Sequence, residues 1–273
     1  MKQRLISSAI LAAILIPVAI FSGVPFVINF FIAYISFVAL QETLSVTSCS
    51  KNKILLTVCS LFALIFPFAP MVENKVPHAP AFCMFIFAMI MLLTFLAKYK
   101  TISFHQFCIA FTLSIVIPLF FTSIYYLRAA EYGIYNLIFM VLCSWGADSG
   151  GYIFGGLYGR HKLCPEISPK KTIEGAIGGI LTSVVTCICL AHIANIFNPE
   201  IDSNMILIIV YSIIVAVFSI LGDLVASLIK RNFKVKDFGS VIPGHGGIMD
   251  RFDSILFASP VLLVFIFISP VFY

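Results

Sequence analysis

Long apolar segments alternate with short polar connections along almost the whole chain of 273 residues. An apolar segment of about 17–25 residues is long enough to cross the hydrocarbon core of a bilayer as an α-helix. The sequence predicts nine such segments, at residues 5–22, 24–44, 54–70, 80–97, 107–127, 132–155, 173–195, 205–229 and 255–272. This pattern predicts an all-α, polytopic integral membrane protein.

The first apolar segment, residues 5–22, has a second interpretation. Its basic start and apolar core are also typical of a secretory signal peptide. The segment has no convincing small-x-small cleavage site, and a second apolar segment follows it at once. We therefore expect it to remain in the protein as a membrane helix.

The composition supports a membrane protein and excludes several other classes. Hydrophobic residues make up 61% of the chain, charged residues only 11%, and the mean hydropathy is +1.08. A water-soluble domain has a charged fraction of about a quarter. The net charge of +5 does not indicate nucleic-acid binding, because the basic residues gather at the ends of apolar segments. The eight cysteines form no CxxC pair and are expected to be buried thiols, neither disulfides nor zinc ligands.

The distribution of Lys and Arg predicts the orientation of the helices. With the amino terminus in the cytoplasm and nine spans, fifteen of the seventeen basic residues fall inside, and only Lys75 and Arg128 fall outside. This is the asymmetry that the positive-inside rule describes. Two polar connections, residues 156–172 and 230–254, then face the cytoplasm. We find no linker that would separate two soluble domains, and expect amino-terminal helices at 1–140 and a catalytic region at 141–273 in one continuous membrane domain.

Polar side chains gather at the end of the predicted eighth span. Asp223, Ser227, Lys230 and Arg231 have offsets of 0, 4, 7 and 8, which place them on one helix face. Simple anchoring by the two cations is the alternative interpretation. An acid one or two turns inside a membrane helix is costly unless it is paired or bound to a ligand, so Asp223 favours a functional site.

The next polar segment, PGHGGIMDRFDS at 243–254, combines glycines with two acids. Three glycines surround His245, and Gly246 and Gly247 are two of them. They would let backbone N–H groups approach a phosphate. Asp250 and Asp253 are three residues apart and repel each other unless a cation lies between them, for which Mg²⁺ is the natural candidate. The alternative is that Asp250 caps the last helix and Asp253 pairs with Arg251.

A second polar segment, residues 145–175, carries a similar mixture. Asp148 lies near the inner membrane boundary and is a further candidate for a metal site or an ion pair. The segment SPKKT supplies two hydroxyls and two ammonium groups immediately before the predicted seventh span: Ser168, Lys170, Lys171 and Thr172. A helix amino terminus with adjacent lysines is a favourable anion site. The spacing is not that of a Walker A loop.

These two segments resemble the phosphatidate cytidylyltransferase (CDP-diacylglycerol synthase) family. Residues 227–253 match its signature S-x-x-K-R-x4-K-D-x-G-x2-I-P-x-H-G-G-x2-D-R-x-D, and residues 145–175 contain its W-x-x-D and S-P-x-K-T-x-E-G elements. Glu42 lies where this family often has an acid. Gly151 departs from the more usual Ala. Over 1–140 the resemblance rests on little more than hydropathy.

The resemblance implies transfer of a cytidylyl group from CTP to phosphatidate, which gives CDP-diacylglycerol and pyrophosphate. It implies Mg²⁺ held by Asp223, Asp250 and Asp148, a second monovalent cation such as K⁺, and a homodimer in the bacterial cytoplasmic (inner) membrane. The expected catalytic residues are Asp223, Lys230, Arg231, Asp250, Arg251 and Asp253. The expected substrate-binding residues are Ser168, Lys170, Lys171, Thr172, Ser227, His245, Gly246 and Gly247.

Two alternatives stay open at the level of sequence. A CTP-dependent polyprenol or phytol kinase, or a cytidylyltransferase acting on an ether lipid, would need the same nucleotide-binding residues. A membrane transporter would be expected to show internal repeats and ionisable residues near the middle of the membrane. Here the polar groups gather at one side, which favours an enzyme.

Overall fold

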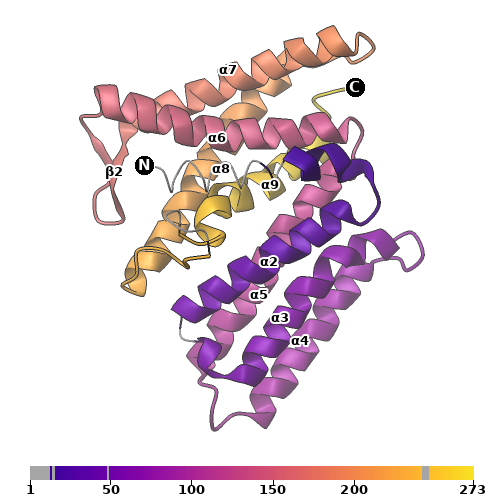
Figure 1. The fold of residues 1–273 in the computed structure, drawn as a ribbon, viewed down its shortest axis with the longest axis vertical. Helices are drawn as coiled ribbons and strands as arrows, with labels where there is room; N and C mark the ends of the chain where they lie inside the picture. Colours follow the sequence, from indigo (N-terminus) through magenta and orange to yellow (C-terminus); the bar gives the residue numbers. More distant parts are fainter. Residues whose placement is uncertain (1–12, 14–15, 48, 242–245) are drawn as a thin grey trace. The chain divides into compact units, whose positions relative to one another are not determined.

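A computed structural model describes residues 13, 16–47, 49–241 and 246–273 (Figure 1). Contacts divide the chain into two compact units, which are described separately. The first unit comprises Met1–Tyr125 and Phe233–Arg251, and the second comprises Tyr126–Asn232 and Phe252–Tyr273. Within the described residues, eight helices are long and apolar enough to cross a membrane, which confirms a polytopic helical membrane protein. The predicted span at 5–22 falls mostly outside the described residues.

The helices of the first unit begin and end at recognisable signals. Its elements are η1 (Phe21–Gly23), α2 (Val27–Val46), η2 (Cys49–Lys51), α3 (Lys53–Ile65), η3 (Phe66–Val72), α4 (Ala79–Ala97) and most of α5 (Phe104–Ala129). Asn52 caps α3 by accepting a hydrogen bond from the N–H of Leu55. Two prolines, Pro67 and Pro70, fall in the η3 turn that follows α3. Proline lacks an N–H donor, so the α-helical ladder cannot continue there.

The second unit contains the segments that the sequence marked as polar. Its elements are α6 (Gly133–Tyr158), β1 (Lys162–Cys164), β2 (Ser168–Thr172), α7 (Ile173–Phe197), α8 (Met205–Asn232) and α9 (Met249–Ile268) from Phe252 onward. Helix α9 begins at Met249, six residues earlier than the predicted span at 255, and Asp250 lies in its first turn, where the helix dipole favours an acid. It ends before Pro270. The last residues pair instead with the α7–α8 connection, where Tyr273 and Asp202 exchange two backbone hydrogen bonds.

A β-hairpin, which the sequence did not predict, connects α6 to α7. Strands β1 and β2 pair antiparallel, with Lys162 opposite Thr172 and Cys164 opposite Ser168. The N–H of Ile173 donates to the carbonyl of His161 and closes the base of the hairpin. The lysines of the polar segment 156–172 therefore lie on two paired strands, Lys162 on β1 and Lys170 and Lys171 on β2.

Glycines let α6 and α7 pack closely. A Cβ atom at Gly150 would collide with the backbone of Gly178, and one at Gly179 would collide with the backbone of Ala147. The hydroxyl of Ser183 donates to the carbonyl of Cys143 at 2.8 Å, which adds a hydrogen bond between the helices. Small residues and interhelical hydrogen bonds are the usual means by which membrane helices associate.

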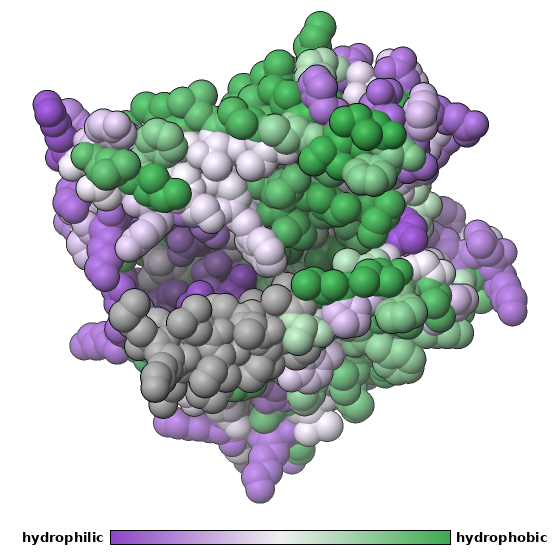
Figure 2. Space-filling view, turned by 45° about the horizontal axis from the view of Figure 1, so that its top comes forward, coloured by the Kyte–Doolittle hydropathy of each residue, from purple (hydrophilic) through white to green (hydrophobic). Residues whose placement is uncertain are grey.

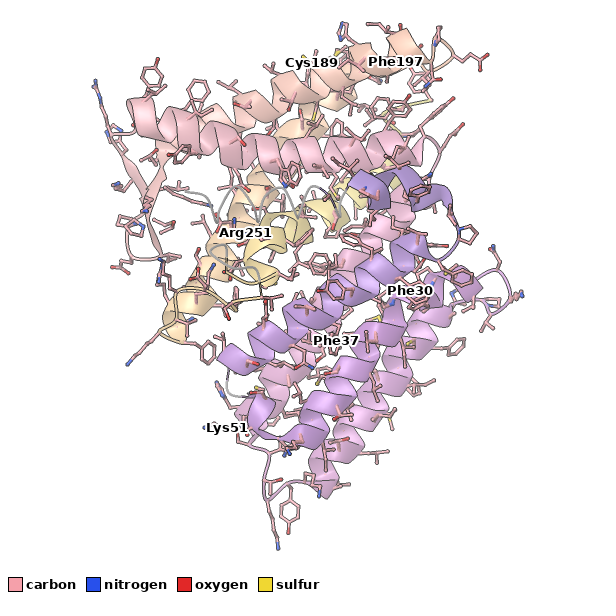
Figure 3. The ribbon with its side chains drawn as sticks, in the orientation of Figure 1. Phe30, Phe37, Lys51, Cys189, Phe197 and Arg251 are labelled. Atoms are coloured by element: carbon pink, nitrogen blue, oxygen red, sulfur yellow. The ribbon has the colours of Figure 1, made fainter. Side chains whose placement is uncertain are left out.

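Apolar side chains are exposed on several helices, as contact with lipid requires. On the face drawn in Figure 2, hydrophobic areas lie beside hydrophilic ones. On α4, the side chains of Phe85 and Leu96 are 64% and 70% exposed, and on α7 that of Phe197 is 77% exposed (Figure 3). In water such surfaces would favour aggregation. In a bilayer they face hydrocarbon.

We expect Gly179→Leu to separate α6 from α7. Overpacking of this kind costs about 1–3 kcal/mol, so the detergent-solubilised protein should unfold at a lower temperature in a thermal scan monitored by size-exclusion chromatography. Gly156→Ala is the matched control, because a Cβ atom there meets nothing within 4 Å. Equal melting temperatures for the two variants would contradict the packing described here.

Candidate active site

The second unit brings a lysine of the hairpin to an acid of α8. Nζ of Lys171 on β2 lies 2.7 Å from Oδ2 of Asp223, and the two side chains are 24% and 28% exposed. The same ammonium group donates to the carbonyl of Ile220 at 3.4 Å. The lysine predicted to bind phosphate and the acid predicted to bind metal therefore form an ion pair with each other.

Of the four polar residues predicted to share one face at the end of α8, only some contact each other. The hydroxyl of Ser227 donates to Oδ1 of Asp223 at 3.3 Å, and Lys230 is buried with 8% of its surface exposed. A lysine that only anchors a helix extends into the headgroup region, so its burial favours a role inside the protein. Arg231 is exposed and donates through Nε to the carbonyl of Ile167 on the hairpin.

A third acid, Asp253, approaches from α9. Its side chain is 7% exposed and interacts electrostatically with Asp223, Asp148 and Lys230. The N–H of Ser254 donates to Oδ1 of Asp253 at 2.8 Å, and the hydroxyl of Ser254 donates to Oδ2 of Asp148 at 3.3 Å. Three helices of the second unit, α6, α8 and α9, thus each contribute one carboxylate to an acidic cluster, defined as Asp148, Asp223 and Asp253.

A glycine allows two of these helices to come close together. A Cβ atom at Gly222, next to Asp223 in α8, would collide with the carbonyl oxygen of Asp253 and the side chain of Phe257 in α9. Glycine at this position therefore permits the approach of the two acids. A small residue at a helix contact is the usual solution in membrane proteins.

The donor set of the acidic cluster suits a hard divalent cation. Within the described residues, no group of three His, Cys, Asp or Glu side chains is placed to hold a metal ion. Mg²⁺ in nucleotide sites typically takes one or two carboxylates and obtains its other oxygens from water and substrate phosphates. Asp223, which pairs with Lys171, and Asp253, which interacts with Lys230, carry the oxygen ligands that such an ion prefers. Magnesium binding therefore stays a prediction that the chemistry of these residues supports.

Asp250 lies in the first unit and holds backbone groups. Its Oδ2 accepts hydrogen bonds from the N–H groups of Phe238 at 2.8 Å and Gly247 at 3.0 Å. Gly246 has a φ of +83°, a conformation that glycine adopts without strain. Both donors precede α9, so these contacts hold the backbone before the helix and are not those of a helix cap. They leave the prediction of a metal ligand at Asp250 untested.

The remaining predicted residues occupy varied environments. Thr172 is buried and caps α7 by accepting from the N–H of Gly175 at 3.1 Å. Lys170 is exposed on β2, and Ser168 is half-buried at its start. Arg251 is exposed in the first turn of α9 (Figure 3). His245 lies outside the described residues.

Two acids, Glu174 and Glu42, have structural roles that the sequence did not predict. Glu174 accepts hydrogen bonds from the N–H groups of Arg160 and His161 and lies 2.6 Å from Nδ1 of His161, which fixes the base of the hairpin. Glu42 accepts from two backbone N–H groups at the start of α9. An acid in an otherwise apolar helix was the available signal for Glu42, but its partners are more than two hundred residues away.

The fold is that of an integral membrane protein, and its polar site contains carboxylates and cations. These are the features of a class of membrane enzymes. Comparison with known proteins identifies the family. A model of the cytidylyltransferase family matches residues 2–269. The chain is 32% identical over 265 residues to a phosphatidate cytidylyltransferase of Staphylococcus haemolyticus, and 33% identical over 269 residues to one of Staphylococcus epidermidis. Each alignment covers 96% of this chain and 97% of the relative.

The chain belongs to the cytidylyltransferase family. It is accordingly a CTP-dependent nucleotidyltransferase, and the resemblance seen in residues 145–175 and 227–253 is confirmed. A phosphatidate cytidylyltransferase of Staphylococcus aureus, 30% identical over 269 residues, shows the same coverage. The match extends over the amino-terminal helices, where sequence motifs gave little information.

We expect Lys171→Ala to raise the KM for CTP about tenfold, the effect of losing one charge-assisted contact of about 1.5–3 kcal/mol. The protein should still fold, since a partly exposed ion pair contributes about 1 kcal/mol or less. Lys162→Ala on β1 of the same hairpin is the matched control. Steady-state kinetics with varied CTP test the prediction, and an unchanged KM in Lys171→Ala would remove this lysine from the nucleotide site.

Proposed function

We propose that the protein is a phosphatidate cytidylyltransferase, which makes CDP-diacylglycerol from CTP and phosphatidate. The observation that carries this proposal is the full-length similarity to bacterial relatives of that name. The membrane fold supports it, because the acyl chains of a lipid acceptor can stay in the bilayer while its phosphate reaches polar residues. The cytidylyltransferase family supplies the nucleotide chemistry.

The reaction transfers a cytidylyl group without a covalent enzyme intermediate. A phosphate oxygen of phosphatidate attacks the α-phosphorus of CTP, and a new P–O bond forms. The bond between the α-phosphorus and the oxygen that leads to the β-phosphorus breaks, and pyrophosphate leaves with that electron pair. Both substrates are anions, so the protein must bring negative charges together and stabilise the leaving group.

The basic residues of the second unit suit this task. Lys171 and Lys230 lie at the acidic cluster, and Arg231 and Lys170 lie on or beside the hairpin. We assign these four cations, with Arg251 of the first unit, to the substrate phosphates. A triphosphate that reaches Lys171 would take the place of the Asp223 carboxylate.

Magnesium is the proposed cofactor, held by Asp223 with Asp148 and Asp250 as further candidate ligands. When bound, it would neutralise phosphate charge and favour departure of pyrophosphate. The chain's own residues orient the site. Ser227 donates to Asp223, and Ser254 donates to Asp148, so each carboxylate is held by a neighbouring hydroxyl. A monovalent cation such as K⁺ and a homodimer are further proposals, which rest on the family resemblance alone.

We place the protein in the bacterial cytoplasmic membrane with the polar segments facing the cytoplasm, where CTP is present. The support is the distribution of basic residues, with fifteen of seventeen on one side of the predicted topology. The amino terminus would then lie inside and the carboxyl terminus outside.

The purified protein in detergent or nanodiscs is expected to release pyrophosphate when CTP and phosphatidate are both present with Mg²⁺. Parallel reactions replace phosphatidate by a polyprenol, by phytol or by an ether-linked phosphatidate, and thin-layer chromatography identifies the lipid product. Phosphorylated polyprenol or phytol with release of CDP would show the kinase activity instead. If only the ether-linked lipid reacts, the acceptor is an ether lipid and not phosphatidate.

The orientation is tested by labelling single cysteines on a cysteine-free background. Ser240→Cys should react with a membrane-impermeant maleimide only after the cells are permeabilised, because residues 230–254 are expected to face the cytoplasm. Lys75→Cys is the matched control, since Lys75 is expected to face the outside and to react in intact cells. Labelling of residue 240 in intact cells would overturn the topology.

A further inference from the structure

A buried acid of α2 holds the start of α9 in the first unit. Glu42 lies toward the carboxyl end of α2, beyond Phe30 and Phe37 (Figure 3), and is 7% exposed. Its Oε1 accepts a hydrogen bond from the N–H of Ile248 at 3.0 Å, and its Oε2 accepts one from the N–H of Met249 at 2.9 Å. Both carboxylate oxygens are therefore engaged at the amino terminus of a helix that begins 207 residues later.

Two glycines of the signature make room for this carboxylate. A Cβ atom at Gly239 or at Gly247 would collide with the carboxylate oxygens of Glu42. Any larger residue at either position would displace the acid or the loop. The requirement for glycine at these positions is therefore explained by a side chain of α2, without a phosphate.

Asp250 completes the arrangement from within α9. It accepts from the N–H groups of Phe238 and Gly247, so four backbone donors end on two carboxylates. The two acids interact electrostatically and repel each other. The positive end of the α9 dipole favours both charges and offsets that repulsion.

The two acids hold different backbone groups. Asp250 accepts from Phe238 and Gly247, which both precede α9, whereas Glu42 accepts from Ile248 and Met249 at the start of the helix. What Glu42 adds is a fixed position of that terminus against α2. The residues held in this way immediately precede Asp250 and Arg251, which the proposed function places in the reaction.

We propose that Glu42 is a positioning residue, which fixes the glycine-rich segment and the first turn of α9 against α2 so that Asp250 and Arg251 meet the substrates. The role in turnover rests on the proposed function. The anchoring itself does not, and it can be measured without substrate.

The first measurement is hydrogen–deuterium exchange of the full-length protein in nanodiscs, for Glu42→Gln, Glu42→Asp and wild type. The amide of Gln would turn an NH₂ group toward one of the two backbone donors, so peptides covering residues 246–251 should exchange at least about tenfold faster, while Asp keeps two acceptors and should give an intermediate rate. Gln41→Leu is the matched control. It removes the side-chain hydrogen bond from Gln41 to Ser60 between α2 and α3 and leaves residues 246–251 untouched.

The second measurement is steady-state kinetics per folded protein, as quantified by size-exclusion chromatography. Loss of one hydrogen bond with a donor left unpaired predicts that Glu42→Gln lowers kcat about 10- to 100-fold. The KM for CTP should change less than kcat, because four of the five cations assigned to the substrate phosphates, at β2 and α8, belong to the second unit. Glu42→Asp should recover part of the rate, and Gln41→Leu should match wild type.

Three results would overturn the proposal. Unchanged exchange at 246–251 in Glu42→Gln would show that the carboxylate does not anchor α9. Faster exchange throughout α6, α7 and α8 would show a general loss of stability. Normal kcat with faster local exchange would show that the anchor does not matter for turnover. If the wild type releases no pyrophosphate from CTP and phosphatidate, the proposed function fails, and the exchange experiment still decides whether Glu42 anchors α9.

Discussion

A charge buried in an apolar helix bundle costs several kcal/mol unless it is paired or fully hydrogen-bonded. This constraint accounts for the placement of the acids described above. In the second unit, Asp223 meets Lys171 and Ser227. In the first unit, Glu42 and Asp250 each accept hydrogen bonds from two backbone N–H groups. The two units therefore stabilise their carboxylates by different means, ion pairing in one and backbone hydrogen bonds in the other.

The two solutions differ in how easily a ligand can exchange with them. The pair of Lys171 and Asp223 is about a quarter exposed, so phosphate oxygens can compete with the carboxylate for the ammonium group at small cost. If CTP binds at Lys171 as proposed, Asp223 loses its counter-charge, and the proposed binding of nucleotide and cation would be coupled through this ion pair. The bonds of Glu42, by contrast, hold backbone at a buried position, where replacement leaves unpaired donors.

The sequence predicted the spans of α2 to α8 to within a few residues, because apolar length is a strong signal in membranes. It also predicted the polar face of Asp223 and Ser227, since helical spacing alone brings residues four apart together. The hairpin and the role of Glu42 were missed for a physical reason. The short strands carry only eight residues, too few for a clear period. Glu42 accepts hydrogen bonds from backbone N–H groups of residues far away in the sequence, and a local sequence pattern cannot predict such contacts.

The glycines show most clearly that a sequence motif does not reveal why each of its residues is required. Gly150 and Gly179 are required by helix packing, Gly239 and Gly247 by the carboxylate of Glu42, and Gly246 by a positive φ. From the sequence alone, each of these glycines is compatible with close approach of a phosphate, and the segment 243–254 predicts such an approach. The N–H groups of Gly247, Ile248 and Met249 are already bonded to carboxylates. A phosphate that bound to these donors would have to displace two acids, which supports the proposal that the nucleotide binds to the cations of the hairpin and α8.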